Sequence, residues 1–331
     1  MTPPAIVAPG PDTMPDQPPS LLADLGATNA RFALVDARGV RSVEILRGAD
    51  YPSLEAAARA YLEKVKPERP PHRAAIAVAG PVTGDRFTLT NLAWTFTTEG
   101  LRDALGLDRL KVVNDFTAVA LSVPHLTDVD RLQIGGGRAE PGAVIGIVGP
   151  GTGLGVSGLI PSADRWIPLA AEGGHVTMAA VTDREGKVMQ RLRQRYQHVS
   201  AERVLSGMGL ANIYESLCAI DGIEDAVMRE PKDVTEAALA KSDPICIEAV
   251  EMFCAMLGTV AGNLALTLGS HGGIYVAGGI VPKLGTVFAE SGFRARFEAK
   301  GRLRPFLEGI PTYIVTHPLP AFLGLKSVLD V

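Results

Sequence analysis

The amino-acid sequence predicts an α/β protein with two similar lobes and a cleft between them. Each half of the chain opens with two apolar, β-like runs around a turn of small residues, at residues 26–29 and 149–153. In both halves a third strand, helices and a buried strand follow in the same order. The length of 331 residues also exceeds what one hydrophobic core usually supports, which favours two lobes.

The composition indicates a small-molecule partner. A hydrophobic content of 47% is enough for a large core, and the net charge of −4 gives no general attraction to nucleic acid or to an anionic membrane. Two basic clusters, at residues 191–195 and 294–304, fit solvated helix faces. We therefore expect no nucleic acid and no membrane among the partners.

The cysteines, the first residues and one long apolar stretch indicate a cytoplasmic protein. The cysteines lack a Cys-x-x-Cys spacing and lie in apolar surroundings, which predicts buried, reduced thiols at Cys218, Cys246 and Cys254. Residues 1–19 are rich in proline and predict a disordered tail and not a signal peptide. Residues 252–284 are nearly uncharged, but Asn263 and Gly272-Gly273 interrupt them. This pattern favours a buried helix and a buried strand over a membrane span.

The first half is expected to begin with a hairpin, because two apolar runs flank the small-residue turn. Ser53 caps an amphipathic helix whose apolar residues form one stripe. In order, the expected elements are a hairpin at 21–36, a strand at 40–46, a helix at 53–66, a strand at 74–79, a hairpin arm at 87–96, a strand at 110–113 and a helix at 117–121.

The second half repeats this order. Pro282 stands at a favoured first-turn position and opens a helix, and Ser242 or Asp243 caps the longest one. The expected elements are strands at 143–148, 155–160 and 166–171, helices at 202–205, 210–219 and 244–268, a strand at 274–277, a helix from 282, and a final strand, proline break and apolar helix from 314.

The two small-residue turns are suited to holding phosphate groups. Backbone N–H groups approach phosphate oxygens closely only where side chains are small, and threonine hydroxyls can donate as well. Each turn alone would be an ordinary tight hairpin. Two of them in equivalent places of a repeat predict a clamp on a nucleotide triphosphate, formed by Gly26, Ala27, Thr28, Asn29, Gly151, Thr152 and Gly153.

Asp115 is the candidate general base. It follows the apolar run 110–113 and precedes a helical pattern, so its carboxylate is expected at the carboxyl edge of a sheet, where open α/β folds bind ligands. Asn114 and Asp115 are also preferred helix N-caps, and a purely capping role is the alternative.

Two nucleotide motifs are excluded. Residues 153–158 match Gly-x-Gly-x-x-Gly, but that fingerprint needs a helix after the turn, and residues 156–160 have the pattern of a strand. The Gly-Lys pair at 186–187 precedes Val188, so it does not complete a Walker motif. Neither a nicotinamide site nor a Walker-type site is expected.

Six motifs together resemble the bacterial glucokinase family. They are D-x-G-x-T-N-x-R at 24–31, V-N-D-F at 113–116, G-P-G-T-G-L-G at 149–155, E-G-G-H at 172–175, S-A-E-R-V-L-S-G at 200–207 and A-G-G-I at 277–280. One departure is Ala27, where many members carry glycine. The resemblance runs from about residue 21 to the last residue. It implies the actin-like ATPase fold, whose two ribonuclease-H-like lobes close over sugar and ATP.

The resemblance also implies the lobes and the roles of individual residues. The small lobe would comprise residues 20–123 and 316–331, and the large lobe residues 124–315, after a tail at 1–19. The sugar hydroxyls would be held by Asn114, Asp115, Glu172, His175 and Glu202. ATP would be held by Ala23, Asp24, Leu25, Gly26, Ala27, Thr28, Asn29, Gly151, Thr152, Gly153, Gly278 and Gly279, and Mg²⁺ by Asp24 through water.

Three of these roles have alternatives in the residues themselves. Glu172 and His175 could form half of a metal site, although no further ligands are close in sequence. Glu202 could simply be an acid in the first turn of a helix capped by Ser200. The Gly278-Gly279 pair could be a simple turn between a strand and a helix.

The implied function is ATP-dependent phosphorylation of D-glucose at its 6-hydroxyl, which gives glucose 6-phosphate and ADP at the entry to glycolysis. Asp115 would accept the hydroxyl proton. The family also suggests a homodimer. Two alternatives stay open: a kinase for another hexose or an N-acetylated amino sugar, and a sugar-binding regulator without turnover. The polar residues indicate a hexose but do not settle the substituent at its 2-position.

Overall fold

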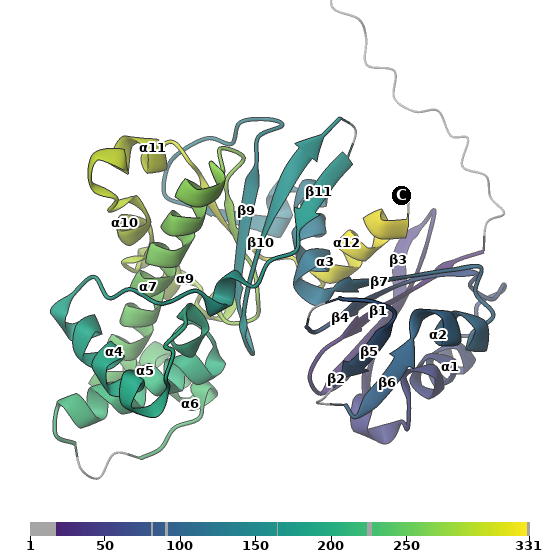
Figure 1. Cartoon of the computed structure of the whole chain (residues 1–331), viewed down its shortest axis with the longest axis horizontal. Coiled ribbons are helices and arrows are strands. Elements are labelled where there is room, and N and C mark those ends of the chain that lie inside the picture. The colour runs from purple at the N-terminus through teal and green to yellow at the C-terminus, as the bar shows by residue number, and fades with distance from the viewer. Residues whose placement is uncertain (1–17, 81, 90–91, 164, 224–226, 330–331) are drawn as a thin grey trace, which may run out of the picture. The chain divides into compact units, whose positions relative to one another are not determined.

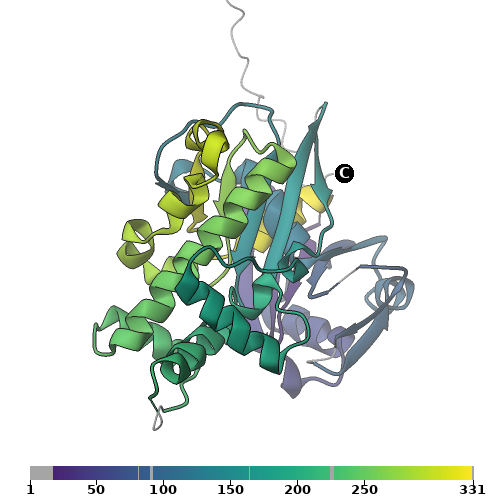
Figure 2. The same ribbon diagram turned by 60° about the vertical axis from the view of Figure 1, so that its left-hand side comes forward.

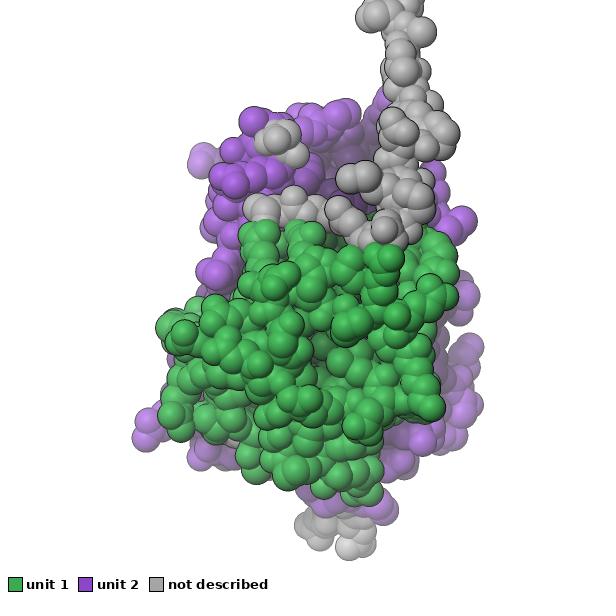
Figure 3. All heavy atoms as spheres, turned by 90° about the vertical axis from the view of Figure 1, so that its right-hand side faces the viewer, with its two compact units in different colours: residues 1–118, 321–331 green, residues 119–320 purple. Residues whose placement is uncertain are grey.

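The computed structural model describes residues 18–80, 82–89, 92–163, 165–223 and 227–329. The chain forms two compact units: unit 1 comprises residues 1–118 and 321–331, and unit 2 comprises residues 119–320 (Figure 1, Figure 3). The predicted lobe boundaries lay at 123/124 and 315/316. Residues 1–17 of the predicted tail lie outside the described residues.

Unit 1 is built on a sheet that has five strands in the described residues. They are β1 (Ser20–Leu25), β2 (Asn29–Asp36), β3 (Gly39–Arg47), β4 (Arg73–Val78) and β7 (Arg109–Asn114), in the order β3-β2-β1-β4-β7. The first three strands pair antiparallel, whereas β1, β4 and β7 run parallel. The predicted hairpin at residues 21–36 and the third strand are confirmed.

Helices pack against the unit 1 sheet. Helix α1 (Leu54–Val65) begins where predicted, because the Ser53 hydroxyl accepts a hydrogen bond from the Ala56 N–H. Its Tyr61 stacks on Phe32 of β2 with ring centroids 5.3 Å apart. Helix α12 (Pro320–Leu329) also belongs to this unit from residue 321 onward, and its Val328 carbonyl accepts a 3.0 Å hydrogen bond from Lys111 of β7.

Unit 2 repeats the strand order of unit 1. Its described strands are β8 (Arg131–Ile134), β9 (Ile145–Pro150), β10 (Leu154–Ser162), β11 (Arg165–Leu169), β12 (Ile274–Val276) and β13 (Thr312–Val315), in the order β11-β10-β9-β12-β13-β8. As in unit 1, three antiparallel strands precede two that are parallel to the first. Strand β8 adds an antiparallel edge that the sequence patterns did not predict.

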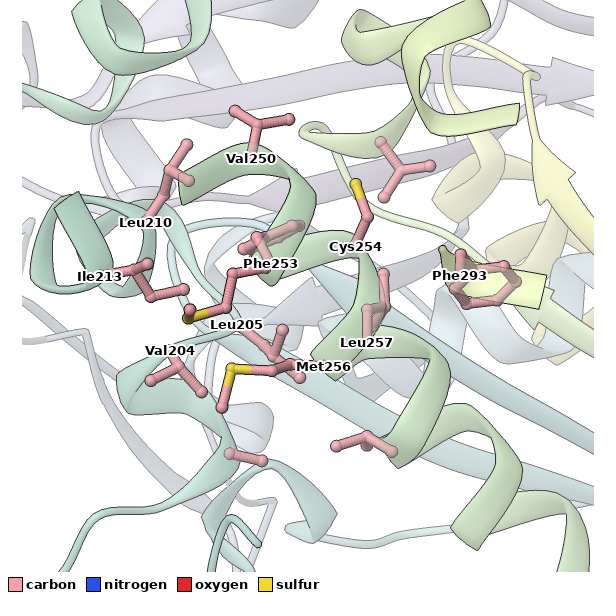
Figure 4. Packing of buried hydrophobic residues seen from close by; sticks show 14 of the residues in the cluster. Val204, Leu205, Leu210, Ile213, Val250, Phe253, Cys254, Met256, Leu257 and Phe293 are labelled. Atoms are coloured by element: carbon pink, nitrogen blue, oxygen red, sulfur yellow. The ribbon is translucent and has the colours of Figure 1, made fainter. Parts of the chain in front are cut away.

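The helices of unit 2 surround a large apolar core. They are α4 (Asp183–Arg195), α5 (Gly207–Ile220), α6 (Pro231–Leu239), α7 (Pro244–Leu268), α8 (Val281–Leu284), α9 (Thr286–Glu290), α10 (Phe293–Glu298) and α11 (Arg304–Glu308). Figure 4 shows Leu210 and Ile213 of α5, and Phe253 and Leu257 of α7, within one buried cluster. Helix α7 also contacts β9, so the core extends to the sheet (Figure 2).

The apolar stretch at residues 252–284 is a core helix and a buried strand, as predicted. In the described part of the chain, α7 is the one helix long and apolar enough to cross a membrane, but 72% of its most apolar window is buried inside the protein. Asp243 caps it by accepting from the N–H groups of Ile245 and Cys246. The three cysteines are free and buried, and burial raises the pKa of Cys246 to about 11 and of Cys254 to about 12.

Several element predictions need correction. The segment at 87–96 is a pair of strands, β5 (Arg86–Leu89) and β6 (Trp94–Thr97), and Asn91 between them lies outside the described residues. The helix predicted at 202–205 is a 3₁₀ turn at Ala201–Arg203, and the Ser200 side chain does not cap it. Helix α2 (Thr98–Ala104) was missed, and α3 (Asp115–Ser122) begins two residues earlier than predicted.

Candidate active site

The polar residues of unit 1 lie at the carboxyl edge of its parallel strands. Leu25 of β1 is in register with Val78 of β4, and Val78 with Asn114 of β7. The three strands therefore end at the same level. Residues just before and after these ends share one edge of the sheet, which is where parallel α/β sheets bind ligands.

Asn114 and Asp115 stand where β7 passes into α3. The Asn114 amide group donates to the Gly80 carbonyl at 3.0 Å and to Asp115 Oδ1 at 3.1 Å. Its Oδ1 accepts from the Thr117 N–H at 2.9 Å, so Asn114 does cap the helix. Asp115 Oδ1 also accepts from the Phe116 N–H at 2.8 Å. These donors orient the Asp115 carboxylate, and the Asn114 side chain that supplies one of them is itself held by the Thr117 N–H.

The first small-residue turn connects β1 to β2. The Gly26 N–H donates to the Asn29 carbonyl, and the Gly48 N–H donates to the Thr28 carbonyl, both at 3.0 Å. The Thr28 side chain is exposed, whereas the side chains of Ala23 and Leu25 are buried in the core. Of the predicted nucleotide residues, Ala23 and Leu25 can therefore offer only backbone groups to a ligand.

Asp24 precedes this turn and pairs with an arginine across the strands. Arg31 is its register partner on β2, and the Arg31 guanidinium donates to Asp24 Oδ2 at 3.0 Å. Burial raises the pKa of the Asp24 carboxyl above its ordinary value, and the Arg31 charge only partly offsets this effect. The sequence motif contained Arg31, but the pairing follows from the antiparallel register and was not predicted.

The second turn connects β9 to β10 in unit 2. The Gly151 N–H donates to the Gly153 carbonyl at 2.8 Å, and the Gly151 carbonyl accepts from the Gly207 N–H at 2.9 Å. Thr152 at its tip is exposed. Gly278 has a φ of +87°, and a Cβ there would collide with the Pro150 carbonyl. The turn, Gly278 and the start of α5 are thereby brought together at the carboxyl ends of β9 and β12.

Two glycines place Glu172 and His175 beside β10. A Cβ at Gly173 would lie 2.7 Å from the Val156 side chain, and one at Gly174 would collide with the Leu154 carbonyl. The 3₁₀ turn Gly173–His175 can pack on β10 only because these side chains are absent. Glu172 and His175 on either side of them are exposed.

Glu202 joins the same region from a distant part of the sequence. Residues 177 and 200 form a β-bridge, and the Ala201 N–H donates to the Val176 carbonyl at 2.8 Å. Glu202 Oε2 then accepts from the Leu154 N–H at 2.9 Å. This contact, directly after the turn at 151–153, was not predicted, because 48 residues separate the two partners.

A metal could be bound in unit 1 by a single carboxylate. Among the described residues no group of three or more His, Cys, Asp or Glu side chains is arranged to hold a metal ion. This result gives no support to a metal site at Glu172 and His175. Mg²⁺ commonly keeps several waters and uses one or two carboxylates with substrate phosphates, and Asp24 beside the first turn fits that use.

Comparison with solved structures gives the class of the protein. The chain superposes on the crystal structure of glucokinase from an Antarctic psychrotroph with a TM-score of 0.86 and 36% identity, covering 95% of this chain and 99% of that chain. Together with the repeated strand order, this places it among the sugar kinases with the actin-like ATPase fold. The family model described as Glucokinase matches residues 21–331. The chain belongs to the glucokinase family.

Two curated relatives are similar over nearly the whole chain. The glucokinase of Paramagnetospirillum magneticum is 53% identical over 312 residues, covering 93% of this chain and 97% of the relative. The "Bifunctional protein glk" of Burkholderia pseudomallei is 54% identical over 312 residues, covering 94% of this chain and 48% of the relative. The chain thus spans about half the length of the bifunctional relatives that it matches.

Proposed function

We propose that this chain transfers the γ-phosphoryl group of ATP to the 6-hydroxyl of D-glucose, which gives glucose 6-phosphate and ADP. The observation that carries the proposal is the setting of Asp115. It follows β7, a partly buried parallel strand, at the carboxyl edge of the sheet, and hydrogen bonds from Phe116 N–H and Asn114 Nδ2 orient one of its oxygens. A carboxylate fixed in this way is suited to accept a proton from a substrate hydroxyl.

Asp115 acts as the general base of the transfer. It accepts the proton of the 6-hydroxyl as the sugar oxygen forms a bond to the γ-phosphorus, and the bond from that phosphorus to the leaving oxygen of ADP breaks in line. Little other covalent chemistry is required of the protein, so the remaining residues bind, orient and supply charge.

The proposed sugar ligands are polar side chains, and their roles come from the family resemblance. Glu172 and Glu202 accept hydrogen bonds from sugar hydroxyls, and His175 and Asn114 can donate or accept hydrogen bonds. A site that pairs each hydroxyl discriminates strongly against analogues that lack one. The side chains of Asn114, Asp115, Glu172, His175 and Glu202 form this proposed set.

The two small-residue turns and the Gly278-Gly279 pair bind ATP. The exposed Thr28 and Thr152 supply hydroxyl donors, and a Cβ at Gly151 or Gly279 would meet open space, so these positions lie open to a ligand. When bound, Mg²⁺ neutralises charge on the phosphates, and Asp24 would hold it through water. Arg31 keeps the Asp24 side chain in place beside the turn.

A coupled ADP-release assay with Mg²⁺-ATP tests the proposal against glucose, mannose, fructose and N-acetylglucosamine. Turnover on glucose that disappears in Asp115→Ala supports it. Preferred turnover on another of these sugars would make the protein a kinase for that sugar. Binding of a sugar without ADP release by the native chain would instead indicate a regulator.

Location and assembly complete the proposal. The buried, free cysteines fit a reducing compartment, and we place the enzyme in the cytoplasm. A homodimer is the expected assembly, and light scattering on the purified chain measures it directly.

A further inference from the structure

The carboxylate of Glu202 is lodged against the turn at residues 151–153. Its Oε2 accepts the Leu154 N–H at 2.9 Å, and it lies 2.5 Å from where a Cβ of Gly153 would be. A side chain at residue 153 would therefore displace this carboxylate. The glycine, which could be explained by phosphate binding alone, also makes room for an acid.

The backbone around Glu202 is fixed. Its carbonyl accepts a 2.8 Å hydrogen bond from the Ser206 hydroxyl, and that hydroxyl also caps α5 by accepting from the Gly209 N–H. The Gly207 N–H holds the Gly151 carbonyl from the same segment. The position of the Glu202 backbone and that of the turn are thus coupled through residues 206 and 207.

A carboxylate in this place has two possible partners in the proposed reaction. As an acceptor with two oxygens, it can serve either the Leu154 N–H or the hydroxyls of a sugar. While it stays at the turn, its negative charge lies beside backbone groups proposed to receive the phosphates, and like charges in close proximity oppose binding.

We propose that Glu202 couples the two substrates. Without sugar its carboxylate holds the Leu154 N–H and opposes nucleotide phosphates at residues 151–153. Sugar hydroxyls draw the carboxylate away and thereby strengthen nucleotide binding. Glu202 is in this respect a positioning residue for the phosphate turn as well as a sugar ligand. The inference rests on the proposed function, since it takes glucose and ATP as substrates.

Glu202→Gln tests this coupling, because the amide keeps an oxygen acceptor for the Leu154 N–H but carries no charge. Isothermal titration calorimetry gives the affinity for Mg²⁺-ADP with and without glucose. In the native chain glucose should strengthen ADP binding by on the order of 10-fold, a usual size of coupling between sites. In Glu202→Gln, ADP should bind more tightly without glucose than it does to the native chain, and the effect of glucose should shrink toward none.

Glu215→Gln is the matched control. Glu215 lies on α5 in the same unit, but it pairs with Arg195 at 3.2 Å. Its substitution removes one negative charge away from the turn, so both ADP affinities should stay as in the native chain. An equal change in both variants would assign the effect to net charge and overturn the inference.

Hydrogen exchange on the native chain gives a second test that needs no variant. Glucose without nucleotide should speed exchange of the Leu154 amide, because its acceptor leaves. Unchanged or slower exchange at this amide, together with demonstrated glucose binding, would contradict the inference.

The outcomes separate the inference from the proposed function. If the native chain phosphorylates glucose but Glu202→Gln leaves the ADP affinities and the effect of glucose unchanged, the coupling is wrong and the kinase function stands. If the native chain binds neither glucose nor ADP, both are wrong.

Discussion

The two units share a strand order but differ in what stands at the edge of the sheet. Unit 1 places acidic side chains there, Asp24 and Asp115, each held by hydrogen bonds from neighbours. Unit 2 places glycines there: Gly174 lies against Leu154, and Gly278 against Pro150, where side chains would collide. The same scaffold thus supplies a candidate base and a candidate metal ligand in unit 1, and closely packed glycines beside the Glu202 carboxylate in unit 2. Substitutions in unit 1 should mainly affect turnover, and those in unit 2 should mainly affect packing and binding.

Asp115→Asn should have the largest effect. The amide keeps the size of the side chain but accepts no proton at neutral pH, so turnover should fall by on the order of 10²–10⁴, the usual contribution of a general base. The measurement is the turnover number at saturating glucose and Mg²⁺-ATP, with thermal unfolding as a check on the fold. Turnover close to that of the native chain would remove Asp115 from the mechanism.

In unit 2 the largest expected effect is on stability, and Gly174→Ala should lower the free energy of unfolding. The new methyl group meets the Leu154 carbonyl, and overpacking of this kind typically costs about 1–3 kcal/mol. Urea unfolding of the variant and of the native chain measures this difference in the free energy of unfolding.

Gly186→Ala is the control for that change. Gly186 lies within α4 and has open space around it, so alanine should stabilise by about 0.5–1 kcal/mol. Equal stability of the two variants would show that the packing of residues 173–174 on β10 is looser than described.

Two N-cap residues, Asn114 in unit 1 and Ser206 in unit 2, allow smaller effects on stability to be compared. Asn114 caps α3 and Ser206 caps α5, and replacing either with alanine should cost about 1 kcal/mol of unfolding free energy. Asn114→Ala should also reduce turnover, because the Asn114 amide donates to Asp115. Asn114→Ser can restore the cap without that donor. Recovery of turnover as well as stability in Asn114→Ser would contradict an orienting role for the amide.

The smallest predicted effect is a pH dependence of stability at Asp24. Burial raises the pKa of this carboxyl above its ordinary value of 3.8, so the folded chain binds the proton more tightly than the unfolded chain. The contribution of Asp24 to stability therefore falls as pH rises from about that value through the raised folded pKa. Asp24→Asn cannot ionise. Urea unfolding gives the free energy of unfolding of Asp24→Asn and of the native chain. The variant value minus the native value should be larger at pH 7 than at pH 4. A smaller difference at pH 7 would mean that the Arg31 pair outweighs burial.

Local patterns were sufficient to predict much of the fold. The hairpins follow from their small-residue turns, and α1 and α7 follow from their caps, Ser53 and Asp243, together with apolar periodicity. Helix α4 was missed although Thr182 and Glu185 form a capping box that the sequence displays three residues apart. Strand β8 could not be recognised in the same way, because it is short and partly exposed at a sheet edge.

Local patterns could not predict contacts between residues that are far apart in the sequence or on different strands. The Asp24–Arg31 pair depends on strand register, and the Leu154–Glu202 contact depends on a bridge between residues 177 and 200. The alternative role of Glu202, an acid in the first turn of a helix capped by Ser200, depended on local sequence alone. In the structure this segment is a 3₁₀ turn without a Ser200 cap, and the Glu202 carboxylate contacts β10. Local sequence can indicate which residue types are present at a site, whereas the fold decides which of them meet.

Identification of the product tests the central proposal most directly. Phosphorus NMR of a reaction with glucose and Mg²⁺-ATP should show one glucose 6-phosphate for each ADP, and 6-deoxyglucose should give no sugar phosphate because it lacks the accepting hydroxyl. ADP formed with inorganic phosphate alone, or a phosphorylated product from 6-deoxyglucose, would contradict phosphoryl transfer to the 6-hydroxyl.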